Sequence, residues 1–109
     1  VTDLRVVVQS TAAVTLGWNN PLVDGFTGVT VRRAAGTVAP SSPTAGSLAV
    51  QTSGSVNEWS DTALTPGATY SYALFAQYAD ATQVPAATIT DWLLSAPVWF
   101  AFTDALWPI

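Results

Sequence analysis

The protein is a chain of 109 residues with a formal net charge of −4; 50% of its residues are hydrophobic and only 9% are charged. A single domain of this length can bury a core without metals or crosslinks. Its three cationic side chains are too few to follow a phosphate backbone, so nucleic-acid binding is not expected. No stretch reaches the ~18–20 uninterrupted apolar residues that cross a bilayer, so no membrane span is predicted.

The residue types needed for most catalysis are missing. The chain has no His, no Cys and no Lys, so its serines have no basic side chain to activate them, and a transition metal would lack its usual ligands. Glu58 and Asp61 could serve as a carboxylate pair, but three positions apart on a strand they point to opposite faces. We therefore expect solvated or turn-capping carboxylates, no enzyme activity, no cofactor and no metal. This expectation covers Asp24, Glu58, Asp61, Asp80, Asp91 and Asp104.

Short alternating runs predict strands in the first half of the chain. A first strand is expected from Leu4 to Val8, a second from Val14 to Trp18, and a third from Val29 to Arg33, after Gly28. Val14, Leu16 and Trp18 share one face, which predicts that they are core residues. Thr30 and Arg32 are expected to face outward. Two adjacent arginines could form a binding patch, but at a strand end Arg32-Arg33 more often form a solvated edge.

A segment rich in Pro, Ser and Gly separates these strands from the rest. Gly36 to Ser47 is predicted to be a surface loop, Leu48 to Val50 a short strand, and Glu58 to Leu64 a fifth strand with Trp59 pointing inward. Tyr78 to Gln83 reads as a hairpin, followed by a last strand from Val84 to Thr90. The pattern is all-β.

The stretch from Leu64 to Ala76 organises the other strands. It opens with the turn signal Pro66-Gly67 and continues with strict alternation, placing Tyr70, Tyr72 and Leu74 on one face. The other face carries Ser71, Ala73, Phe75 and Gln77, as expected for a strand in a half-buried antiparallel sheet.

These motifs resemble those of a known family. Leucine, Pro-Gly and then a strand-opening tyrosine are similar to the tyrosine corner of fibronectin type III modules, with Tyr70 as the corner tyrosine. Trp18, which ends the second strand shortly before a proline, is also similar to the fibronectin type III pattern. The segment Trp59-Ser60-Asp61-Thr62-Ala63-Leu64 before Thr-Pro-Gly resembles the bacterial modules of this family that are attached to secreted enzymes and surface proteins. The resemblance implies a seven-stranded immunoglobulin-like sandwich over residues 1–90, in a protein that is secreted or at the cell surface. The sequence begins at Val1, with neither an initiator Met nor a signal peptide, which favours a processed protein or an excised fragment.

Residues 91–109 form an aromatic C-terminal extension, the tail, which reads DWLLSAPVWFAFTDALWPI. No charge falls between Asp91 and Asp104. Val98 to Thr103 has high strand propensity, while Pro97 could instead begin a helix running to Trp107. We expect this tail to be a docking or assembly element whose partner-binding residues are Trp92, Val98, Trp99, Phe100, Phe102 and Trp107.

Three functional hypotheses follow for this non-catalytic module. The first is that the chain is a spacer or interaction module of an extracellular assembly. The second is that it is a subunit that uses the tail to bind another protein or further copies of itself. Alternatively it is a carbohydrate-binding accessory module of a secreted enzyme, with Trp92, Trp99 or Trp107 as stacking platforms. Packing of the tail against its own sandwich is the remaining interpretation.

Overall fold

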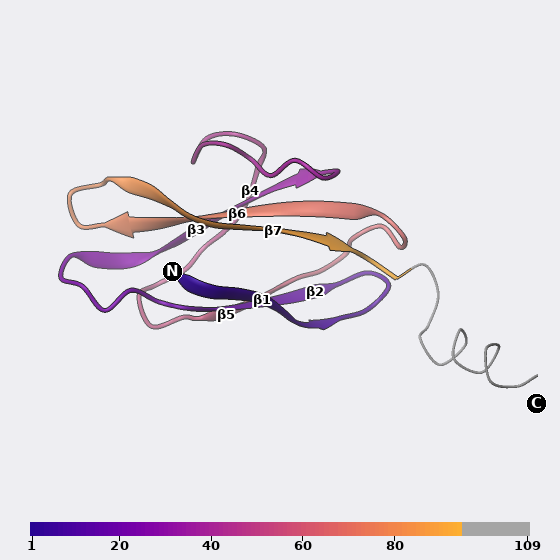
Figure 1. Ribbon diagram of the computed structural model, residues 1–109, viewed down its shortest axis with the longest axis horizontal. Coiled ribbons are helices and arrows are strands. Elements are labelled where there is room, and N and C mark those ends of the chain that lie inside the picture. Colours follow the sequence, from indigo (N-terminus) through magenta and orange to yellow (C-terminus); the bar gives the residue numbers. More distant parts are fainter. Residues whose placement is uncertain (95–109) are drawn as a thin grey trace, which may run out of the picture.

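The computed structural model describes residues 1–94. Seven strands form two antiparallel sheets packed face to face, and no helix occurs in this part of the chain (Figure 1). One sheet has the order β1-β2-β5, and the other has the order β4-β3-β6-β7. The strands are β1 (Thr2–Gln9), β2 (Val14–Asn19), β3 (Phe26–Ala35), β4 (Ser47–Gln51), β5 (Glu58–Asp61), β6 (Thr69–Tyr78) and β7 (Gln83–Trp92). The predicted seven-stranded sandwich is confirmed.

The core lies between the sheets and consists of the side chains that alternation assigns to it. Trp18 and Tyr72 are its largest fully buried members. The Trp18 indole N–H donates a hydrogen bond to the Asn20 side-chain oxygen at 2.8 Å. Trp59 and Tyr70 pack against its margin and are only partly buried. Val14, Leu16 and Leu74, which the alternation places on inward faces, are buried, and so are Val29, Val31 and Leu64. Leu93, assigned to the tail from the sequence, joins this core.

The turn before β6 has the geometry that Pro66-Gly67 predicts. Gly67 has a φ of 76°, a conformation that suits a residue without a Cβ. The Tyr70 hydroxyl accepts a hydrogen bond from the Thr65 backbone N–H at 3.1 Å. The tyrosine corner is therefore present, and it fixes the entry of the chain into β6.

Strand β6 is buried on both faces, so the expectation of a half-buried strand is wrong here. Ser71, Ala73 and Phe75 on the outer face are no more than 2% exposed. The loop of residues 36–46 between β3 and β4 covers part of this face: Pro40 is buried, and the Ser71 hydroxyl donates to the Gly36 carbonyl at 2.7 Å. Thr30 on β3, also predicted to face outward, is 1% exposed.

Arg32 holds this loop in place instead of forming a solvated edge. Its Nε donates to the Ala45 carbonyl at 2.8 Å, and its Nη2 donates to the Gly46 carbonyl at 2.9 Å. Because the guanidinium satisfies two loop carbonyls, the Pro/Ser-rich segment takes one defined path over the sheet. The predicted surface loop is thus part of the fold.

Strand β7 continues past Thr90, the last residue that the sequence assigns to the sandwich. It ends at Trp92, and the Leu93 N–H then donates to the Ala68 carbonyl at 2.9 Å. The Gly67 N–H donates to the Leu94 carbonyl at 3.1 Å. The chain is therefore hydrogen-bonded to the sandwich as far as Leu94. The strand expected from Val98 to Thr103 and the alternative helix from Pro97 to Trp107 lie outside the described residues.

Candidate interaction surfaces

The most polar cluster of the interior is an ion pair that joins the two sheets. The Asp61 carboxylate on β5 accepts hydrogen bonds from Arg33 Nη1 at 2.6 Å and from the Tyr72 hydroxyl at 2.8 Å. Asp61 is 6% exposed, so the expectation of a solvated carboxylate is wrong. Arg33 is likewise not part of a solvated edge, because it binds Asp61 and lies over the Tyr70 ring with its Cζ 5.7 Å from the ring centroid.

The electrostatics of this cluster are those of a structural contact. Its hydrogen bond to Asp61 raises the pKa of the Arg33 guanidinium, and burial together with the same carboxylate raises the pKa of Tyr72 well above its usual value. All three groups are satisfied, and no buried side-chain nitrogen or oxygen lacks a partner within residues 1–94. The cluster holds β3, β5 and β6 together.

The carboxylates considered for catalysis do not come together. Glu58 is exposed while Asp61 is buried, as expected for residues on opposite faces of β5. Asp80 caps its own turn, because its Oδ1 accepts from the Thr82 hydroxyl at 2.6 Å and from the Thr82 N–H at 3.1 Å; these bonds lower the pKa of Asp80. No group of three or more potential metal-ligating side chains is found among the described residues.

Asp91 lies at the far end of β7, against β1. The Gln9 amide, oriented with its nitrogen toward Asp91, donates to both carboxylate oxygens at 2.8 and 2.9 Å. Burial raises the pKa of this carboxyl, while the two hydrogen bonds from the Gln9 amide favour its ionised form. The contact ties the last part of β7 to the three-stranded sheet, just before the chain leaves the sandwich.

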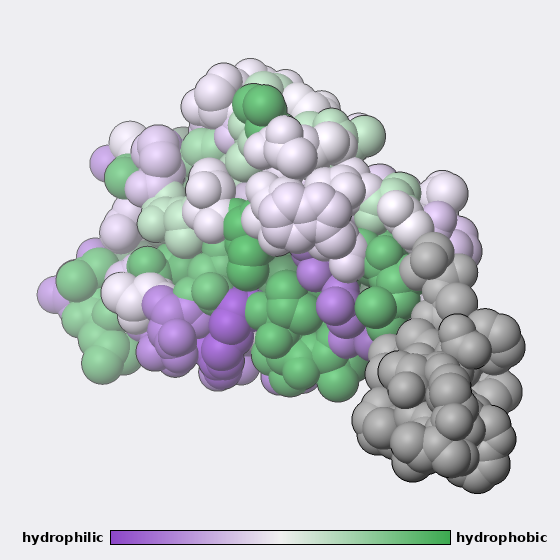
Figure 2. Space-filling view, turned by 45° about the vertical axis from the view of Figure 1, so that its right-hand side comes forward, coloured by the Kyte–Doolittle hydropathy of each residue, from purple (hydrophilic) through white to green (hydrophobic). Residues whose placement is uncertain are grey.

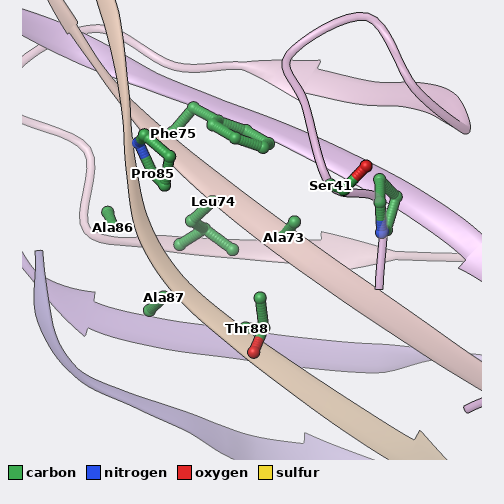
Figure 3. Close-up of a pocket in the computed structure, with 9 residues that line it drawn as sticks. Ser41, Ala73, Leu74, Phe75, Pro85, Ala86, Ala87 and Thr88 are labelled. Atoms are coloured by element: carbon green, nitrogen blue, oxygen red, sulfur yellow. The ribbon is translucent and has the colours of Figure 1, made fainter. Parts of the chain in front are cut away.

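An apolar depression of about 320 Å³ lies on the outer face of the four-stranded sheet (Figure 3). Its floor is formed by β6 with Ala73 and Phe75, one wall by Pro40 and Ser41 of the 36–46 loop, and the other by residues 85–88 of β7. No charged side chain among the described residues lines it. The depression exists because the loop stands above the sheet on one side only.

Trp92 is the one residue of the predicted docking set that the structure describes. It ends β7 and is 62% exposed, next to the buried Asp91 and Leu93. An indole held on a strand and largely open to water offers a rigid apolar surface. The other five predicted partner-binding residues, Val98, Trp99, Phe100, Phe102 and Trp107, lie outside the described residues.

Further exposed apolar side chains are spread over both ends of the sandwich, and Figure 2 shows apolar residues over much of the lower part of one face. At the end of the sandwich opposite Leu94, Leu22 is 100% exposed and Val23 is 56% exposed in the β2–β3 loop. This loop is tied to its neighbours, since the Asn20 amide donates to the Gly54 and Val56 carbonyls and the Ala79 N–H donates to the Gly25 carbonyl.

Sequence reasoning did not find the depression. The available signal was Phe75, a large apolar residue on the face of β6 that alternation assigned to solvent. A buried outward phenylalanine needs a covering segment, and the Pro-rich loop supplies it through Pro40. The path of that loop depends on long-range bonds from Arg32 and Ser71, which periodicity does not reveal.

No protein-family model matches the sequence, and neither does any curated protein. No helix long and apolar enough to cross a membrane occurs within residues 1–94.

Solved structures with the same fold do match. The FN1–FN3 domains of chicken CNTN1 superpose with a TM-score of 0.70 at 22% identity, covering 85% of this chain and 30% of that one. The fn3 domain of human contactin 1 gives a TM-score of 0.70 at 20% identity, over 87% of this chain and 76% of the other. A family 28 exopolygalacturonase from Yersinia enterocolitica gives a TM-score of 0.69 at 16% identity, over 88% of this chain and 20% of the enzyme. The chain thus spans under a third of the chicken protein fragment and a fifth of the enzyme. At these identities the likeness shows the fold, and this chain has the fold of a fibronectin type III domain.

Proposed function

We propose that this chain is a non-catalytic interaction module of a secreted or cell-surface protein, of the kind found in bacteria, and that it assembles with further copies of itself through its tail. The observation that carries the proposal is Trp92. An indole 62% open to water at the end of an ordered strand leads directly into an uncharged aromatic segment. Contiguous exposed apolar patches mark interaction sites, and Trp92 together with the aromatic segment that follows it has the composition of such a patch.

The composition of the tail supports the same conclusion. Three of the five Trp and two of the four Phe fall within residues 91–109, a segment with no basic residue. Each aromatic ring can bury about 150–250 Å². The space between the two sheets is already filled by residues of the strands together with Leu64 and Leu93. A neighbouring chain therefore offers the tail more apolar surface than its own core does.

The test is the size of the particle in solution. The full chain and a variant ending at Leu94 are compared by size-exclusion chromatography with light scattering from 1 to 200 µM. Truncation begins after Leu94 because Leu93 belongs to the core and Leu94 accepts a hydrogen bond from Gly67. We expect the full chain to assemble and the shortened chain to be a folded monomer.

A double variant, Trp99→Ala with Phe100→Ala, is expected to lose assembly in the same way. Leu22→Ala serves as the control, because it removes a fully exposed apolar side chain at the other end of the sandwich. A full chain that stays monomeric over the whole concentration range contradicts the proposal and favours packing of the tail on its own sandwich.

The second candidate, a carbohydrate-binding accessory module, is favoured by the same exposed indole and by the occurrence of this fold within an exopolygalacturonase. A flat aromatic ring can stack on a sugar. Cellulose and soluble xylan are suitable neutral probes, because the net charge of −4 disfavours acidic polysaccharides. Retention that Trp92→Ala abolishes would support this candidate, and equal retention of both proteins would reject it.

A further inference from the structure

The apolar depression and the tail have matching chemistry. The depression is bordered by the exposed Pro85 and has the largely buried Phe75, Ala73 and Pro40 at its base, and no charged side chain of the described residues lines it. Its volume of about 320 Å³ is at the lower end of the range of ligand pockets. The tail carries no charge from Ser95 to Thr103 and supplies Trp99, Phe100 and Phe102. Neither surface would leave a charge buried without a partner when they meet.

The edge of β7 is poorly suited to accept the tail as an extra strand. Pro85 has no N–H to donate, and the pairing of β6 with β7 shifts register between Leu74 and Phe75, next to this proline. A β-bulge and a proline at an edge both interrupt a continuous ladder. Side chains entering the depression from above the sheet avoid this obstacle, because they need no backbone bonds to β7.

The direction of the chain favours the depression of another copy. Leu93 and Leu94 are held by Ala68 and Gly67, and the chain leaves the sandwich at the right-hand end in Figure 1. The depression extends along β7 from Pro85 to Thr88, nine to six positions before Leu94, which at about 3.3 Å per residue is roughly 20–30 Å away. To reach the depression of its own chain the tail must reverse its direction, whereas the depression of a neighbouring molecule requires no reversal.

We propose that the depression of one copy holds aromatic side chains from residues 98–102 of a second copy. This inference rests on the proposed self-assembly and names its acceptor site. Donor and acceptor are different surfaces of the same chain, so two copies can exchange tails reciprocally in a closed dimer, whereas one-way contacts give larger rings or open filaments. Light scattering and electron microscopy distinguish these products.

Crosslinking can locate the contact, because the natural chain contains no cysteine. Thr88→Cys places a thiol at the rim of the depression on an exposed position of β7, and Ala101→Cys places one in the tail without removing a ring. The two single-cysteine proteins are mixed and oxidised, and the mixed disulfide is counted by mass spectrometry. Thr2→Cys, an exposed threonine on β1 in the other sheet, is the matched control.

We expect the 88–101 disulfide to exceed the 2–101 disulfide at least tenfold. Equal yields would overturn the acceptor site while leaving assembly through the tail intact. In a protein carrying both Thr88→Cys and Ala101→Cys, a disulfide that forms within one chain at low concentration would show that the tail returns to its own depression, and would also overturn the inference.

A charge at the rim provides an independent measurement on the full chain. Thr88→Glu is expected to weaken self-association about tenfold or more, because the carboxylate would be buried against apolar rings. Thr2→Glu adds the same charge elsewhere and is expected to leave association within about twofold of the parent. If both variants assemble equally well, the depression is not the acceptor. If even the parent chain does not assemble, the proposed function itself fails.

Discussion

Replacing Asp61 tests whether the ion pair between the sheets stabilises the fold. Asp61→Ala leaves the fully buried Tyr72 hydroxyl without an acceptor and Arg33 without its counter-ion. Removing one partner of a buried pair typically costs about 3–5 kcal/mol. The Arg33 side chain is 30% exposed and can regain water, so we expect a value near the lower end, about 3 kcal/mol.

Urea unfolding followed by tryptophan fluorescence measures this loss. With a slope of about 1–3 kcal/mol per molar urea, the midpoint is expected to fall by roughly 1–3 M. Glu58→Ala, on the same strand but exposed, is the control and is expected to change the free energy of unfolding by less than about 0.5 kcal/mol. A midpoint for Asp61→Ala that matches the control would show that the buried pair adds no net stability.

Three further predictions concern the stability of the same sandwich. Because the pKa of Tyr72 is raised in the folded state, its contribution to stability is complete below the unfolded value near pH 10 and is lost as pH rises above it; Tyr72→Phe is expected to flatten that alkaline decline in the free energy of unfolding. Tyr70→Phe removes the acceptor for the Thr65 N–H and is expected to cost about 0.5–1.5 kcal/mol in urea unfolding, and an unchanged midpoint would argue against the tyrosine corner. Gly28→Ala would place a Cβ 1.9 Å from the Thr52 carbonyl oxygen and is expected to lower the melting temperature by more than 10 °C, whereas Gly54→Ala meets nothing closer than 3.5 Å and is expected to shift it by no more than a few degrees.

Much of this architecture can be predicted from the sequence because it depends on local alternation. Val14, Leu16 and Trp18 alternate on a strand with a clear stop at Asn20-Pro21, and the structure buries all three. The Pro66-Gly67 turn fixes where β6 starts, so its inward face follows directly. These features need only the period of a strand and the conformational limits of two residues.

The remaining features depend on contacts between distant parts of the chain. Arg33 and Asp61 are separated by 28 positions, and nothing in the local pattern of either residue indicates its partner. Leu93 lies beyond the apparent last strand, and only its burial in the core and its bond to Ala68 show that the sandwich includes it. The depression likewise arises from the meeting of the loop with β6 and β7. For the five tail residues from Val98 to Trp107, the expected role in binding stays a prediction.

The burial of both faces of β6 has a consequence for the local opening motions of the domain. β6 lies between β3 and β7, with the core under one face and the 36–46 loop over part of the other. Its amide protons therefore have no route to solvent through small local openings. In hydrogen–deuterium exchange, residues 71–76 are expected to exchange last and only when the whole sandwich unfolds, whereas the edge strands β1 and β4 exchange earlier. The slowest-exchanging region of this domain would then be a single strand, and its exchange rate would report the global free energy of unfolding.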